Sequence, residues 1–93
     1  MDMTQLRAVK RQASLRLITV RWRVNVEMQR LESAVRMARG AEFWEAVRMA
    51  ASREKSLRWE VGQRIQDVDL ARSEIRRRKR QSQSVRHACA RKL

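Results

Sequence analysis

The sequence predicts an all-α fold, an antiparallel coiled-coil hairpin of two helices, and three observations carry this prediction. Apolar residues recur every three or four positions along both halves of the chain, which places them on one face of each helix. Gly40 lies close to the middle, where a reversal would give two helices of similar length. The chain has no proline, two glycines and no tyrosine, a composition that favours helix and leaves few places for turns.

The first helix is expected over residues 4–39. Asp2 or Thr4 can cap its start, because a side-chain oxygen there accepts hydrogen bonds from unpaired backbone N–H groups. Arg36 and Arg39 lie in the last turn, where the helix dipole favours cations. The stripe expected to face the second helix consists of Leu6, Val9, Ala13, Leu17, Val20, Val24, Met28, Leu31, Val35 and Ala38.

The second helix is expected over residues 42–79, after a turn at 40–41. A single continuous helix is the alternative, because one glycine costs a helix only about 1 kcal/mol. The second stripe is rotated by about 110° from the first, and the break falls at Gly40, which favours the turn. This stripe consists of Phe43, Val47, Ala50, Glu54, Leu57, Val61, Ile65, Val68, Arg72 and Ile75.

The register of the hairpin can be predicted as well. Residues that face each other in an antiparallel pair have numbers with a nearly constant sum, and pairs such as Leu6 with Ile75 and Val24 with Leu57 sum to 81. Two charged residues interrupt the stripe: Glu54 would face Met28, and Arg72 would face Val9 near the open end.

The first helix has a second apolar face that a two-helix hairpin cannot cover. Burying a large apolar side chain stabilises by about 1.5–3 kcal/mol, so we expect a partner surface. A second copy would complete a four-helix bundle as a homodimer, in which Trp22 would be a core residue. Alternatively, another protein would supply a helix, and Trp22 would anchor it. The sequence leaves both open. This predicted partner-binding face lies about 170° from the stripe and consists of Leu15, Ile18, Trp22 and Val26.

The chain is strongly basic, with 23 Lys and Arg against 10 Asp and Glu and a formal net charge of +13. Such a charge attracts nucleic acid, anionic membranes or acidic protein surfaces. Residues 80–93 hold no acid and little apolar content, so we expect a disordered or frayed basic tail, which could also serve only solubility. The predicted polyanion-binding residues are Arg76, Arg77, Arg78, Lys79, Arg80 and Arg86.

No catalytic, cofactor or metal site is predicted. His87 and Cys89 form a pair that could hold a soft metal, but a structural zinc site takes four ligands and no others are near in the sequence. A single cysteine suits a reducing compartment, and no apolar run reaches the roughly 20 residues of a membrane span. These features indicate a cytoplasmic protein without a secretory signal. The acid-poor, basic segment before Val26 leaves a mitochondrial location as an alternative, and the arginine run leaves a nuclear one.

The opening Leu6-Arg7-Ala8-Val9-Lys10-Arg11 and the two balanced stripes resemble the FliJ/YscO-type stalk proteins of type III secretion and flagellar export ATPases. The resemblance implies a cytoplasmic, non-enzymatic hairpin that engages an ATPase ring and other export components. The function expected from the sequence is therefore a protein-interaction hairpin within a larger assembly. The alternative is a small nucleic-acid-binding protein that uses the arginine-rich helix surface and tail.

Overall fold

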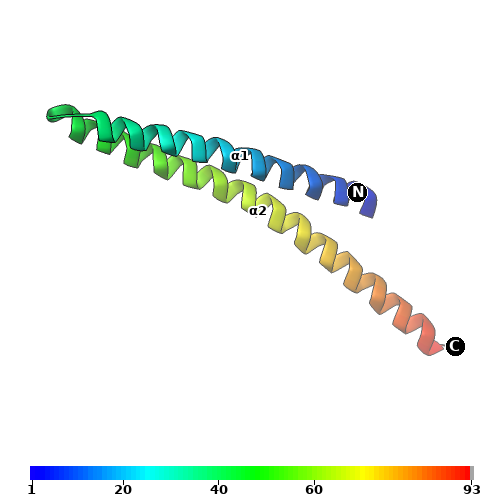
Figure 1. Cartoon of the computed structure of the whole chain (residues 1–93). Coiled ribbons are helices and arrows are strands. Elements are labelled where there is room, and N and C mark those ends of the chain that lie inside the picture. Colours follow the sequence, from blue (N-terminus) through cyan, green and yellow to red (C-terminus); the bar gives the residue numbers. More distant parts are fainter. Residues whose placement is uncertain (93) are drawn as a thin grey trace.

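The computed structural model confirms the all-α hairpin. It describes the backbone of residues 1–92 and the side chains of residues 1–86. Two helices, α1 (Met3–Met37) and α2 (Ala41–Lys92), pack side by side in opposite directions (Figure 1). The molecule is a rod of 81 × 17 × 17 Å. Because a helix rises about 1.5 Å per residue, the 52 residues of α2 account for the length of this rod.

Asp2 is the N-cap of α1, one of the two residues that the sequence offered for this role. The Asp2 Oδ1 accepts a hydrogen bond of 2.7 Å from the backbone N–H of Gln5. In return the Gln5 Oε1 accepts one of 2.9 Å from the backbone N–H of Asp2. This capping box satisfies two of the backbone donors that a helix start leaves unpaired, and it lets α1 begin at Met3.

The chain reverses at Gly40, as predicted, but the reversal starts earlier than expected. Ala38 is already extended (φ −74°, ψ 143°), so α1 ends at Met37 and not at residue 39. Gly40 has φ 63°, in the left-handed region that glycine tolerates best, and its carbonyl accepts a hydrogen bond of 3.2 Å from the N–H of Phe43. An extended residue and a left-handed one together turn the chain into α2.

The core is the seam between the two helices. Leu57 is the most buried side chain, with 1% of its surface exposed, and most other stripe residues, such as Val24 and Val61, are half-buried. This is the distribution expected of two helices without further layers, because each residue can be covered from one side only. The buried residues are Leu6, Ala13, Leu57, Val68, Ala71 and Ile75.

Two predicted seam positions are wrong. Val9 and Arg72 are exposed; Lys10 is half-buried beside Val9, and Ala71 is buried beside Arg72. In a two-stranded coiled coil the seam advances by alternating steps of three and four residues, so after Val68 it passes to Ala71 and then to Ile75. The step to Arg72 would also have buried a guanidinium without a partner, which is costly.

The helix α2 continues to Lys92, beyond the expected end at residue 79. No proline or glycine follows Gly62, and a helix already nucleated by packing extends at little cost. An Arg78 Nη donates a hydrogen bond to the carbonyl of Met1, which marks the end of the paired region. Past it, α2 runs on alone (Figure 1) with residues 80–86 exposed. Of the expected tail, Leu93 lies outside the described residues.

Candidate functional site

The apolar face predicted on α1 lies away from the seam. We call Leu15, Ile18, Trp22 and Val26 the outer strip. The exposed fractions of Leu15, Ile18 and Trp22 are 58%, 63% and 70%, while Val26 is half-buried. Steps of three, four and four residues along a helix keep these side chains on one side of α1. The hairpin therefore leaves three large apolar side chains in water on one continuous face.

Among the described side chains of α2, the exposed apolar residues do not form a comparable strip. Trp59 is 68% exposed, but the residues three and four positions away are serine, lysine, glycine and glutamine. Trp44 lies beside the turn, where its ring meets Phe43 edge-on with 5.4 Å between the ring centroids. Leu70 is exposed among charged neighbours. Isolated apolar side chains of this kind are normal on protein surfaces.

Cations surround the outer strip. Arg11, Arg16 and Arg30 are exposed, and α1 has no acidic residue before Glu27. The Thr19 hydroxyl is turned inward to its own helix, because it donates a hydrogen bond of 3.0 Å to the carbonyl of Leu15. The surface around the strip is therefore apolar at its centre and positive at its edges.

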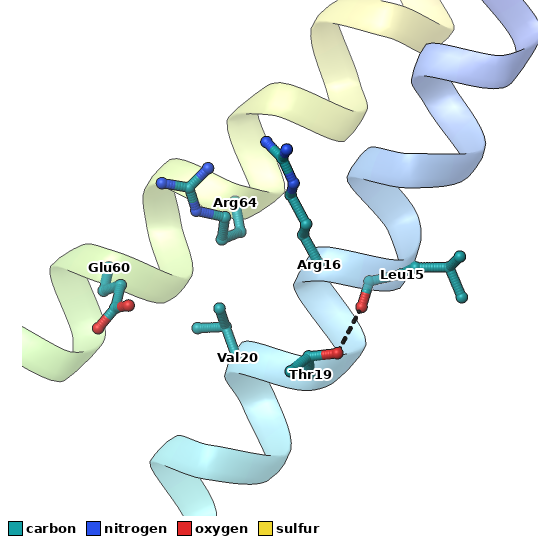
Figure 2. Close-up of a pocket in the computed structure, with 6 residues that line it drawn as sticks. All are labelled: Leu15, Arg16, Thr19, Val20, Glu60 and Arg64. Atoms are coloured by element: carbon teal, nitrogen blue, oxygen red, sulfur yellow. Dashed lines mark hydrogen bonds between the residues drawn. The ribbon is translucent and has the colours of Figure 1, made fainter.

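A shallow groove between the helices borders the strip. Figure 2 shows Arg16 extending toward α2, whereas Leu15 points away from α2. The one acid of this groove, Glu60, forms an ion pair with Arg23, which balances its negative charge. The groove lies between Leu15, Arg16, Thr19, Val20, Glu60 and Arg64.

The arginine run is not uniform. Arg77 forms two hydrogen bonds with the carboxylate of Glu74, of 2.9 and 2.6 Å, and Arg78 donates a third of 3.0 Å. These bonds lower the pKa of Glu74 to about 2, and those from Arg77 have the largest effect. Two of the predicted polyanion-binding residues are thus engaged with an acid. The other four predicted residues are exposed and form no ion pair among the described side chains: Arg76, Lys79, Arg80 and Arg86.

The structure also brings together cations that lie far apart in the sequence and that the sequence did not connect. A second groove, at the open end of the hairpin, lies between the two helices and has no acidic residue in its walls. The missed signal was the helical spacing of basic and polar residues on the flank of the α1 stripe, next to the seam. We call this second groove the basic groove. Its walls are Arg7, Lys10, Arg11 and Ser14 of α1 with Ile75 and Lys79 of α2.

Neither a metal site nor a membrane span is found in the part of the chain that the structure describes. There, no three His, Cys, Asp or Glu side chains gather closely enough to hold a metal ion. No helix has a stretch long and apolar enough to cross a membrane. The side chains of His87 and Cys89 lie outside the described ones.

Comparison with known proteins identifies no relative: no family model, curated protein or solved structure matches the chain. The resemblance to export-ATPase stalk proteins thus rests on the sequence pattern alone. Two surfaces of the hairpin remain as candidate binding sites, the outer strip and the basic open end.

Proposed function

We propose that the protein is a non-enzymatic interaction hairpin that joins a larger assembly through the outer strip of α1. The supporting observation is that Leu15, Ile18 and Trp22 are all more than half exposed on one helix face, opposite the seam. Aromatic residues flanked by aliphatic ones are typical anchors of protein interfaces, because covering them removes a large apolar area from water. A helix laid along α1 would match the length and direction of the strip.

The proposed occupant is an amphipathic helix of another protein with acidic residues beside its apolar face. A second copy of this chain suits the strip less well. In a two-fold symmetric pair each subunit offers the same patch, so the arginines around one strip would face those around the other. Arg11, Arg16 and Arg30 would then repel their counterparts, whereas an acidic partner would pair with them.

We further propose that this assembly is a type III secretion or flagellar export ATPase in the cytoplasm, with the hairpin as its stalk. Support comes from the resemblance and from the shape. A stalk needs length and stiffness, and here α1 is tied to α2 along a common seam within a molecule that is 81 Å long. The single cysteine suits a reducing compartment.

The test asks whether the outer strip binds a second copy of the chain or another protein. Sedimentation first measures the mass of the full chain over a range of concentrations. Tagged wild-type, Trp22→Ala and Trp59→Ala chains then capture proteins from an extract, and any protein lost only with Trp22→Ala is purified and titrated. We expect Trp22→Ala to weaken that binding by about 2 kcal/mol, typical of a buried aromatic anchor. Trp59→Ala, equally exposed but without a strip around it, should have little effect.

Three outcomes would contradict the proposal. Equal capture by wild type and Trp22→Ala would remove the outer strip from the interface. A concentration-dependent doubling of mass that Trp22→Ala abolishes would make the occupant a second copy. Failure of the purified export ATPase to bind wild-type chain would reject the stalk role, while another captured partner would still support the interaction hairpin.

A further inference from the structure

We infer that the open end of the hairpin is a binding site for the phosphate backbone of double-stranded nucleic acid, built by both helices. The basic groove supplies cations from α1 and α2, and the lone part of α2 continues the positive surface beyond the hairpin. This site contains none of the four outer-strip residues and shares only Arg11 with the cations around them, so its test, which leaves Arg11 unchanged, is independent of the proposed function.

The charge of the chain is concentrated at this end. Residues 1–20 and 61–92, which form the open half, hold 14 Lys and Arg against 4 Asp and Glu, a net charge of +10. Residues 21–60, which form the half with the turn, hold 9 against 6, a net charge of +3. A rod with such an asymmetry directs a polyanion to one end, because the attraction depends on local charge density.

Within the open end, two of the acids lie on the other side of the seam from the basic groove. Asp67 is bound to Arg64 at 3.0 Å, and Asp67 and Glu74 both line a groove on the other side of the seam from the basic groove. Among the described side chains, none of Arg7, Lys10, Arg11 and Lys79 takes part in an ion pair. The acid that borders the basic side is Asp69, two helical turns before Arg76.

The groove has the donors that phosphate recognition needs. Three of its cations come from α1 and Lys79 comes from α2, so a phosphate placed between the helices would meet positive charge from both sides. The hydroxyl of Ser14, half-buried in the wall, adds a neutral donor. Interactions of this kind fix a backbone in position without reading its sequence.

The lone part of α2 extends the site. It carries Arg80 and Arg86 on exposed positions, and no acid follows Glu74. A single helix fits the major groove of duplex DNA, which is about 12 Å wide. Basic helices that continue out of a coiled coil bind DNA in this way. Here a single basic helix extends from an antiparallel pair, because α2 continues past the end of α1 (Figure 1).

The local composition favours a duplex over other polyanions. Between Arg76 and Arg86 the only apolar residue is Val85, so this helix lacks the apolar face that insertion into a membrane surface requires. No Phe, Tyr or Trp follows Trp59, so single-stranded bases would find none of these large aromatic rings to stack on there. A duplex, with about one charge per 1.7 Å of its axis, offers these cations the densest array of phosphates.

The experiment measures binding of the full chain to a fluorescent 20-base-pair duplex by anisotropy between 50 and 200 mM salt. The test variant combines Arg7→Gln, Lys10→Gln and Lys79→Gln. The control combines Arg36→Gln, Arg39→Gln and Arg48→Gln, three residues near the turn, and lowers the net charge equally. Circular dichroism first checks that both variants keep the helix content of the wild type.

We expect the groove variant to bind the duplex at least about tenfold more weakly at 100 mM salt, and the control less than about threefold. The slope of log affinity against log salt should fall by about 2.7 for the groove variant, because each phosphate that is no longer neutralised reduces the slope by about 0.9. Equal weakening in both variants would show that net charge alone acts and would overturn the inference. So would a single strand, a polyglutamate peptide or phosphatidylserine vesicles bound as tightly as the duplex by the wild-type chain.

Discussion

The Nε of Arg53 donates a hydrogen bond of 2.6 Å to the Oε1 of Glu27, and so links α2 to α1 in the middle of the hairpin. Further toward the open end, Arg23 and Glu60 form a second ion pair between the helices. The residue numbers of both pairs sum to within two of the predicted 81, so these pairs lie in the predicted register. Exposed ion pairs add little stability, so the main role of these two pairs is to hold the helices in this register.

Exchanging these two charges tests that role. Glu27→Arg should lower the unfolding midpoint, because it places a guanidinium opposite Arg53, and adding Arg53→Glu should restore it. The recovery is the informative quantity, since it isolates the interaction between the two side chains. Thermal unfolding followed by circular dichroism measures it. If Glu27→Arg leaves the midpoint unchanged in low salt, the two helices do not meet at this register.

The burial of Leu57 gives a second prediction. It is 1% exposed on α2, and removing a buried leucine side chain costs about 2–5 kcal/mol. We expect Leu57→Ala to reduce the free energy of unfolding by about 2 kcal/mol or more in guanidinium titrations. Met49→Ala is the matched control, because Met49 is 65% exposed on the same helix and should change stability by less than about 0.5 kcal/mol. Equal effects would place the seam elsewhere.

The seam shows how far the sequence could determine the fold. The apolar period and the central glycine predicted two helices, the turn and the register, because these depend on local geometry. The period did not separate Val9 from Lys10 or Arg72 from Ala71, since a seam that drifts by one residue keeps nearly the same pattern. That choice depends on how the two helices supercoil, which is a property of the pair.

The two candidate binding surfaces also differ in whether the sequence could predict them. The outer strip was predictable, because it is periodic within one helix. The basic groove was not, because Lys79 meets Arg7 and Lys10 only once the two helices are paired. The six predicted polyanion-binding residues look alike in the sequence, yet the engagement of Arg77 and Arg78 by Glu74 is visible only in the structure.

The Glu74 cluster predicts a dependence on pH. Hydrogen bonds from Arg77 and Arg78 lower the pKa of Glu74 from its ordinary 4.5 to about 2. A carboxyl with a lowered pKa stabilises the folded state fully above its unfolded pKa, and this contribution is lost as the pH falls from about 4.5 to about 2. In a carbon-detected NMR titration of the glutamate carboxyls, Glu74 should be the last to take up a proton as the pH is lowered.

Substitution of the partner tests the cause. Arg77→Gln removes the first of the groups that lower the pKa, so the midpoint of Glu74 should rise toward 4.5. Arg80→Gln is the control, because Arg80 is exposed on the same helix and forms no ion pair among the described side chains. A Glu74 midpoint that is unmoved by Arg77→Gln would show that the hydrogen bonds do not persist in solution.

The two glycines should respond in opposite directions to alanine. Gly40 has φ 63°, which an alanine adopts only with strain, so Gly40→Ala should lower the free energy of unfolding by about 1 kcal/mol or more. Gly62 lies inside α2, and a Cβ added there would meet nothing within 4 Å. Gly62→Ala should therefore raise stability by up to about 1 kcal/mol, because alanine loses less backbone freedom on folding. Guanidinium titrations of the two variants measure both effects against the same wild type. Stabilisation by Gly40→Ala would indicate that the chain continues as one helix through residue 40, and would contradict the hairpin itself.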